Sequence, residues 1–274
     1  MIAIVTDSTA PITRQEAVLC GVSVVPHSYV ANGTAYMENY EDMNNDYTNR
    51  LTSAGSNAFT GQSTTAAFST VFRKLLAQGF DILCIVISSR LSGTWSGAVT
   101  AAREIGHANI AVIDSHATAG ALYYQVMMAR QLADKGLPFS EIADRCGKLC
   151  QKAEVAFSVE DMSALRRSRR LGTLSQSVNT ILNCRPVFLL KNGTIVLYDL
   201  AHGRKNRVEM MASLVPTNAN QIMVQGFGKT PIANSLTHLL QEKYPRISVL
   251  QREIGPVIST HIGTEALCVS WCLA

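Results

Sequence analysis

The stretch "DILCIVISSRLSGTWSGA", residues 81–98, decides the fold class of this chain. Residues 82–87 form an uninterrupted apolar run of the length that a buried strand needs. Small hydroxyl residues follow this run, and the pattern from Thr94 onward predicts a helix. A buried strand that leads through a polar turn into a helix is typical of an α/β fold.

Other apolar runs in the first half of the chain repeat this pattern. They are "IAIVTD" (residues 2–7), "VSVVPHSYV" (residues 22–30) and "NIAVIDS" (residues 109–115), and a long helix is predicted over residues 118–135. Their continuous apolar character indicates burial on both faces, as in a parallel sheet covered by helices. The polar stretch "ENYEDMNND", residues 38–46, is predicted to be a loop.

The second half of the chain has a different pattern of apolar runs and turns. Asn192 and Gly193 stand between two apolar runs, which is a strong hairpin signal. Helical and strand patterns then alternate to the end, so we expect a mixed sheet. We predict an N-terminal domain over residues 1–154 with a mostly parallel sheet flanked by helices. We predict a C-terminal mixed-sheet α/β domain over residues 155–274.

Composition limits the classes of function. The chain has 274 residues, of which 47% are hydrophobic and 16% charged, and no apolar run reaches the length of about 18 residues that spans a bilayer. The opening residues are predicted to be a strand rather than a signal peptide, and the seven cysteines to be reduced core thiols, so we expect a cytoplasmic protein. The net charge of +4 is concentrated in "RRSRR", residues 166–170, without the long basic, aromatic-bearing face of a nucleic-acid binder.

Polar clusters follow several of the predicted strands, where α/β sheets bind ligands. They are "VTDST", "FTGQST", "SSRLSGT" and "VIDSHATAG", and none of them is a nucleotide-binding motif. Ser92 precedes the helix that begins near Thr94, so it either caps that helix or holds an anion at its positive end. The local sequence leaves both interpretations open.

His261 is a second candidate, because Gly255, Pro256 and Gly263 shape what we expect to be a loop between two late strands. A hydrolase or acyltransferase would use Ser92 as a nucleophile and His261 as its base. The stretch around Ser92 lacks the GxSxG motif of a nucleophile elbow, and no Asp partner can be assigned, so this alternative ranks lower.

Seven blocks along the chain resemble the DegV family of bacterial fatty-acid-binding proteins, the acyl-carrier subunits of fatty acid kinase. These blocks are "IAIVTDST", "FTGQST", "ISSRLSGTWSGA", "VIDSHATAGA", "SALRRSRRLG", "CRPVFLLKNGTI" with "GRKNR", and "STHIGTEA". They cover almost the full length in the family's order.

The resemblance implies a two-domain α/β fold that holds one long-chain fatty acid. The acyl chain would occupy an apolar tunnel within the second domain, which would be the lipid-binding one. Near the domain boundary, the carboxylate would bind Thr60, Ser92 and His261, with Gln62 beside them and a backbone N–H from Gly93. Hydroxyl and imidazole donors suit a desolvated carboxylate. No cofactor or metal is expected in this chain, and neither nucleic acid nor stable membrane insertion.

The resemblance also implies a partner, a separate fatty acid kinase that phosphorylates the carboxylate to an acyl-phosphate for phospholipid metabolism. Exposed arginines would dock this partner, with Arg170 as the best candidate. The full set is Arg166, Arg167, Arg169, Arg170, Arg204 and Arg207. A lipid sensor that contacts no kinase is a third alternative.

The chain departs from the family pattern in three places. Gly61 and Ser63 replace Ser and Pro, and Ser168 with Arg169 replaces a pair of glycines. Thr264 and Glu265 replace Pro and Gly after His261. We expect the Glu265 carboxylate either to repel the ligand or to pair with His261 and raise its pKa.

Overall fold

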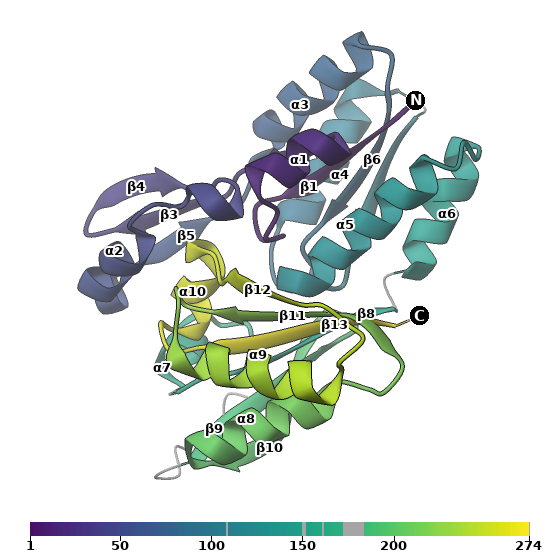
Figure 1. Ribbon diagram of the computed structural model, residues 1–274. Helices are drawn as coiled ribbons and strands as arrows, with labels where there is room; N and C mark the ends of the chain where they lie inside the picture. Colours follow the sequence, from purple (N-terminus) through teal and green to yellow (C-terminus); the bar gives the residue numbers. More distant parts are fainter. Residues whose placement is uncertain (108, 150–151, 161, 172–183, 274) are drawn as a thin grey trace.

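The computed structural model of the chain describes residues 1–107, 109–149, 152–160, 162–171 and 184–273. They form an α/β fold with a four-stranded sheet, a six-stranded sheet and a small three-stranded sheet (Figure 1). The predicted fold class, a parallel sheet flanked by helices and then a mixed-sheet α/β part, is confirmed.

The four-stranded sheet is parallel and has the order β2-β1-β6-β7. Its strands are β1 (Ile2–Asp7), β2 (Val22–Val25), β6 (Asp81–Val86) and β7 (Ile110–Asp114). Along β6, Leu83 and Ile85 join one apolar cluster, whereas Ile82 and Cys84 join another. Both faces of the sheet are therefore buried, which explains the uninterrupted apolar runs in its strands.

Helices cover both faces of this sheet. Phe68 and Phe72 of α3 and Ala98 of α4 pack in the cluster with Ile82, whereas α1, α5 and α6 contribute to the cluster on the other face. The helices are α1 (Arg14–Cys20), α3 (Thr65–Ala77), α4 (Thr94–Ile105), α5 (Ala119–Ala133) and α6 (Phe139–Leu149). The helix predicted over residues 118–135 thus corresponds to α5, with each end one or two residues shorter.

The run predicted as one strand over residues 22–30 is divided between two sheets. β2 ends at Val25, and β3 (Ser28–Ala31) pairs in an antiparallel sheet with β4 (Thr34–Met37) and β5 (Phe59–Gly61). The break falls at Pro26, which has no N–H to continue the ladder.

The segment between β4 and β5 contains elements that the sequence did not predict. The expected loop over residues 38–46 includes the 3-10 turn η1 (Glu41–Met43). It is followed by α2 (Tyr47–Ala54) and by a second 3-10 turn, η2 (Gly55–Asn57). This segment brings Thr60 of β5 close to α10 (Pro256–Ile262), the short helix near the end of the chain.

The six-stranded sheet is mixed and has the order β10-β9-β8-β13-β11-β12. Only β11 and β12 pair in parallel in this part of the described chain. Asn192 and Gly193 connect β9 to β10 with φ angles of 49° and 76°, which confirms the predicted hairpin turn. The strands are β8 (Ala153–Ser158), β9 (Cys184–Lys191), β10 (Thr194–His202), β11 (Ala219–Gly226), β12 (Val249–Glu253) and β13 (Leu267–Leu273).

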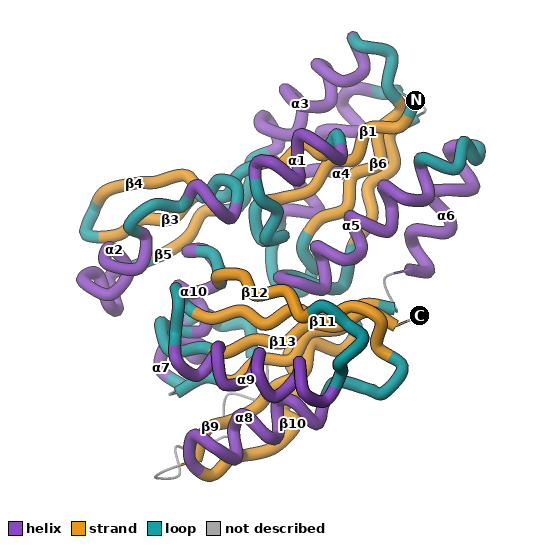
Figure 2. Tube along the Cα trace, viewed as in Figure 1, coloured by secondary structure: helices purple, strands orange, loops and turns teal. Residues whose placement is uncertain are grey.

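Helices α8 (Gly203–Leu214) and α9 (Pro231–Lys243) cover one face of the mixed sheet. Helix α5 packs on the other face and also on the parallel sheet, so it lies between the two larger sheets (Figure 2). Two short helices complete this region, α7 (Ser163–Arg167) and α10 (Pro256–Ile262). The division of the chain into domains at residues 154 and 155 stays a prediction.

Candidate functional site

A cavity of about 260 Å³ lies where the loops after β2, β6 and β7 meet the mixed sheet. This is the edge of a parallel sheet at which α/β proteins bind ligands. All five predicted ligand residues line this cavity, although they come from distant parts of the chain: Thr60, Gln62, Ser92, Gly93 and His261. The structure adds three further polar side chains that the prediction did not include: His27, Thr118 and Arg170.

The mixed sheet and its short helices form an apolar wall of the cavity. Phe157 of β8 lies on this wall and stacks on Phe188 of β9, with ring centroids 5.1 Å apart. The other apolar side chains of the wall include Val155, Leu165, Leu190, Ile195 and Ile262. A cavity with an apolar wall and a few convergent polar groups is the usual form of a small-molecule site.

Ser92 and Gly93 lie at the start of α4, as predicted. Gly93 is the N-cap residue, and the Ser92 hydroxyl accepts a hydrogen bond from the Thr94 N–H at 3.3 Å. Oγ of Ser92 is also 2.9 Å from Oγ1 of Thr94. A Cβ atom at Gly93 would lie 2.4 Å from Oε1 of Gln62, so glycine lets the Gln62 side chain approach the backbone here.

His261 lies in the last turn of α10, so the prediction that it occupies a loop is wrong. Its Nδ1 is 3.0 Å from Nη1 of Arg170, and its Nε2 is 2.8 Å from Oγ1 of Thr60. A guanidinium group only donates, so Nδ1 is the acceptor and the single proton of the neutral ring is on Nε2. His261 therefore donates to Thr60, and the Thr60 hydroxyl keeps its own proton for a ligand.

Electrostatics keep the His261 ring neutral. Burial is the main cause that lowers the pKa of His261 to about 3, and the positive charge of Arg170 acts in the same direction. At neutral pH the ring therefore donates from one nitrogen only, which agrees with the hydrogen bonds that it makes.

Arg170 belongs to this cavity and not to a freely exposed docking surface. Its Nε donates to the carbonyl of Leu91 at 2.7 Å, and its Nη1 donates to the carbonyl of Ser168 at 3.1 Å. Burial lowers the pKa of Arg170, but a guanidinium stays protonated in proteins. A permanent cation therefore lies at the polar end of the cavity.

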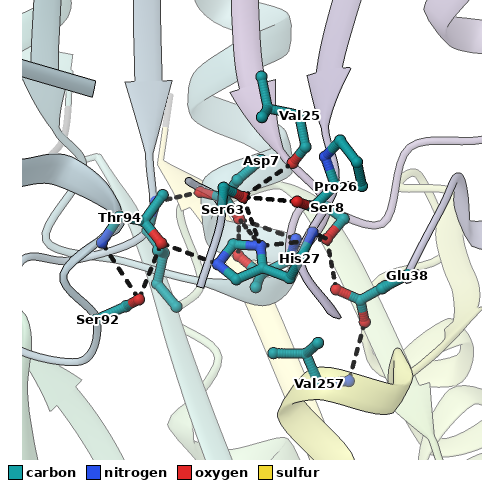
Figure 3. A network of polar contacts seen from close by, with 12 residues as sticks. Asp7, Ser8, Val25, Pro26, His27, Glu38, Ser63, Ser92, Thr94 and Val257 are labelled. Atoms are coloured by element: carbon teal, nitrogen blue, oxygen red, sulfur yellow. Dashed lines mark hydrogen bonds and ion pairs between the residues drawn. The ribbon is translucent and has the colours of Figure 1, made fainter. Parts of the chain in front are cut away.

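His27 is a buried polar residue of the site that the sequence analysis missed (Figure 3). Its Nε2 is 2.9 Å from Oγ1 of Thr94, and its Nδ1 lies 3.2 Å from the hydroxyls of Ser8 and Ser63. Burial lowers the pKa of His27 against the opposing charge of Asp7. The signal in the sequence was the histidine directly after Pro26, at the carboxyl end of a buried strand.

Comparisons with known proteins identify the family of this chain. A family model described as an uncharacterised protein of the DegV family matches residues 1–274, the whole chain. The chain belongs to the DegV family. A DegV domain-containing protein from Listeria innocua is 27% identical over 278 residues, covering 99% of this chain and 98% of the relative.

Solved DegV structures share the fold. A fatty acid binding DegV family protein from Streptococcus agalactiae has a TM-score of 0.90 at 22% identity, covering 100% of this chain and 99% of that chain. A DegV family protein from Thermus thermophilus, described by its fatty acid binding, has a TM-score of 0.87 at 25% identity, with the same coverage.

Glu265, one of the departures from the DegV pattern, has a different environment from the one we expected. It lies in a second groove with Arg185 and Arg204, and its backbone carbonyl accepts from Nη2 of Arg207 at 2.9 Å. It is not among the described residues that line the cavity, and it does not raise the pKa of His261. The expected pairing of Glu265 with His261 is therefore wrong, whereas repulsion of the ligand by its carboxylate stays a prediction.

The arginines considered for partner docking divide into two groups in this DegV chain. Arg166, Arg167, Arg169 and Arg204 are exposed. Arg207 is only 1% exposed, and its guanidinium binds Oγ and the carbonyl of Ser158 as well as the carboxylate of Glu160. Arg207 therefore stabilises the fold and offers nothing to a docking partner.

The geometry does not assemble a nucleophile from Ser92 and His261. Among the described residues, the Ser92 hydroxyl contacts atoms of Thr94, whereas His261 bonds to Thr60 and Arg170. A base whose pKa is about 3 is also a weak proton acceptor at neutral pH. The hydrolase alternative thus lacks the hydrogen bond that it requires.

The described residues contain neither a candidate metal site nor a candidate membrane span. No group of three His, Cys, Asp or Glu side chains in this part of the chain could hold a metal ion. None of the helices there combines the length and the apolar character needed to cross a bilayer.

Proposed function

We propose that this DegV protein binds a long-chain fatty acid in the cavity beneath Ser92 and His261. The observation that carries the proposal is the form of the cavity, which has an apolar wall along the mixed sheet and hydrogen-bond donors at one end. Each buried methylene group would contribute about 0.8 kcal/mol to binding. The fatty acids that DegV proteins of Thermus thermophilus and Streptococcus agalactiae bind support this ligand class.

The carboxylate of this ligand would meet donors of two kinds. The Thr60 hydroxyl has its proton free because His261 supplies the hydrogen bond to its oxygen. Ser92 and the Gly93 N–H lie at the start of α4, where the helix dipole favours an anion, and Gln62 adds an amide. Arg170, through His261, contributes a positive charge that is partly desolvated.

In this proposal the protein is a carrier and not an enzyme. It presents the carboxylate to a separate fatty acid kinase subunit, which phosphorylates it to an acyl-phosphate for phospholipid metabolism. The exposed arginines, above all Arg166 and Arg204, would dock this partner, and Arg170 would act at the ligand. A cytoplasmic location fits the six described cysteines, all of which are free thiols: Cys20, Cys84, Cys146, Cys184, Cys268 and Cys272.

Native mass spectrometry of the purified protein, followed by denaturing extraction, tests ligand binding. We expect one fatty acid per chain, with occupancy reduced in Ser92→Ala, Thr60→Val and His261→Ala. Thr237→Val is a matched control, because Thr237 is a buried threonine of α9 whose hydroxyl has no hydrogen-bond partner among the described residues. A protein that is empty and ignores added fatty acids would overturn the proposal.

A pull-down with a purified fatty acid kinase subunit tests the carrier role separately. We expect that Arg166→Ala combined with Arg204→Ala weakens capture of the kinase while fatty acid occupancy stays unchanged. If the double variant still captured the kinase as well as the wild type does, the docking role of these two arginines would be contradicted. A loaded protein that no kinase subunit captures would instead favour the lipid sensor.

A further inference from the structure

A chain of buried side chains connects Glu38 to Ser92 at the cavity (Figure 3). Oε2 of Glu38 is 2.6 Å from Oγ of Ser8, which is 3.2 Å from Nδ1 of His27. Nε2 of His27 is 2.9 Å from Oγ1 of Thr94, which is 2.9 Å from Oγ of Ser92. We call these five residues the Glu38 chain. Its far end, Glu38, has no part in the ligand contacts described above.

The protein is built to hold Glu38 in this place. The residue is 0% exposed, and its Oε1 accepts the N–H of Val257 in the first turn of α10 at 3.0 Å. A Cβ atom at Gly255 would lie 2.3 Å from the same oxygen, so glycine leaves the room that the carboxyl group needs. Glu38 therefore contacts the helix that carries His261 and, through the Glu38 chain, the cavity residue Ser92.

The hydrogen bonds of the Glu38 chain have one direction when Glu38 is protonated. Glu38 then donates to Ser8, and the Ser8 hydroxyl donates to Nδ1 of His27. The Nε2–H of His27 donates to Thr94, and the Thr94 hydroxyl donates to Ser92. Every acceptor along the chain is satisfied, and the proton of Ser92 is left to point into the cavity, where a carboxylate accepts it.

When Glu38 is ionised, each hydrogen bond reverses. Ser8 donates to Glu38, and the Nδ1–H of His27 donates to Ser8. Thr94 then donates to Nε2 of His27, and Ser92 donates to Thr94. Ser92 now presents only lone pairs to the cavity, and these repel a carboxylate. The two arrangements use the same atoms and distances and differ by one proton.

Neighbouring groups act on this balance in both directions. Oδ1 of Asp7 lies 3.7 Å from Nδ1 of His27 and favours a proton on that nitrogen. Oγ of Ser63 has the same effect, because it donates its own proton to backbone carbonyls and lies 3.2 Å from Nδ1. Burial, with the charge of Asp7, raises the pKa of Glu38 to about 8 against the lowering effect of its hydrogen bonds from Ser8 and Val257. Burial, with a smaller effect of the positive charge of Arg170, lowers the pKa of His27 and keeps it neutral, so His27 carries one ring proton in either arrangement.

We propose that Glu38 is a positioning residue for the ligand carboxylate, because its proton decides whether the Ser92 hydroxyl donates into the cavity or turns away from it. The inference rests on the proposed binding of a carboxylate at Ser92. It adds that binding takes up a proton wherever Glu38 is ionised in the free protein.

Isothermal titration calorimetry tests this inference with two ligands of one chain length, a fatty acid and the corresponding fatty alcohol. Both are used at concentrations where they are monomeric, between pH 6.5 and pH 9.5. The wild-type affinity for the acid is expected to be about tenfold weaker near pH 9 than near pH 7. The reason is that the fraction of protein with protonated Glu38 falls by about the same factor. The affinity for the alcohol, which can donate as well as accept, is expected to change little.

Glu38→Gln is the decisive variant. Its amide NH₂ would donate to Ser8 at every pH while its oxygen accepts from Val257, so the acid affinity should lose its decline near pH 9. Titrations in buffers of different ionisation enthalpy should show uptake of about one proton per wild-type molecule near pH 9. This uptake should be absent in Glu38→Gln.

Thr94→Val cuts the Glu38 chain next to Ser92 and keeps the shape of the side chain. The acid affinity of this variant should also become independent of pH, and it should be weaker near pH 7. Thr237→Val, the control outside the Glu38 chain, should keep the wild-type profile, as should any variant that is merely less stable. His261 also gains a proton more readily beside a carboxylate, but uptake from that source would persist in Glu38→Gln.

The titrations distinguish a wrong role for Glu38 from a wrong proposed function. A wild-type affinity for the acid that is flat between pH 7 and pH 9 would overturn the role of Glu38 and leave fatty acid binding intact. A decline that survives in both Glu38→Gln and Thr94→Val would do the same. A wild-type protein that binds the acid at no pH would overturn the proposed function, and this inference with it.

Discussion

Arg170 donates to Nδ1 of His261 at 3.0 Å, and this contact fixes the position of the only proton on the neutral ring. Because that proton lies on Nε2, His261 donates to Thr60, and the threonine hydroxyl stays available as a donor. An arginine that need not touch the ligand thus determines what a neighbouring hydroxyl can bind.

Arg170→Met is therefore expected to weaken fatty acid binding even though it keeps much of the apolar side chain. The loss should be about 1.5–3 kcal/mol, the usual range for a hydrogen bond to a charged group. Calorimetric titration with a fatty acid measures it. Arg103→Met, at an exposed position of α4, is the control and should bind like the wild type. Unchanged affinity in Arg170→Met would contradict this role.

The stability of the ligand-free protein should fall as the pH drops below about 6.5. The pKa of His261 is lower in the folded state than in the unfolded state, so the unfolded state binds the proton first. For a folded pKa of about 3, the loss at about pH 5 is about 2 kcal/mol from this residue. Denaturant unfolding near pH 7 and near pH 5 measures the loss. In His261→Gln the difference between the two pH values should shrink by that amount, and an equal difference would refute the assignment.

Gly255→Ala should destabilise the fold, because the new Cβ would lie 2.3 Å from Oε1 of Glu38. We expect a loss of about 1–3 kcal/mol in the free energy of unfolding. The double variant with Glu38→Ala should lose less than the sum of the two single variants, since the clash is then removed. Gly147→Ala, at an open and exposed helical position of α6, should instead be slightly stabilising. Strict additivity at Gly255 and Glu38 would show that the two residues do not meet.

Arg204 and Arg207 lie one helical turn apart and should respond in opposite ways. Arg207→Ala removes a buried partner of Glu160 and Ser158, so we expect a loss of about 1–3 kcal/mol in unfolding free energy. Arg204→Ala removes an exposed cation and should leave stability within about 0.5 kcal/mol of the wild type. Thermal and denaturant unfolding compare the two variants. Equal losses would mean that Arg204 also stabilises the fold.

Much of the fold followed from local signals in the sequence. The apolar run and hydroxyl-rich turn in residues 81–98 correctly indicated a buried strand before a helix, because parallel strands covered on both faces leave no polar alternation. Asn192 and Gly193 likewise marked a turn that requires positive φ angles.

The errors arose where one local signal supports two structures. Pro256 and Gly263 suggested a loop around His261, yet proline favours the first position of a helix and glycine the position after its end. They enclose a helix of only seven residues. Pro26 similarly ended one strand and let the next join a different sheet.

The polar network of the site could not be predicted because it depends on contacts across large sequence separations. Thr60 and His261 are 201 residues apart, and His27 and Thr94 are 67 apart. Nothing near Glu38 in the sequence indicates that its carboxyl group is buried against α10. The candidate ligand residues were placed by family resemblance, whereas their hydrogen-bond partners became visible only in three dimensions.

The stacked pair of Phe157 and Phe188 would let the apolar part of the cavity change in evolution independently of its polar end. Phe157 borders the cavity and Phe188 supports it from the neighbouring strand, so shortening either ring would deepen the space without touching the polar end. Duplicated genes could therefore divide a mixture of acyl chains among themselves through substitutions at two positions. The residues and the partner that contact the carboxylate would not have to change with these two positions.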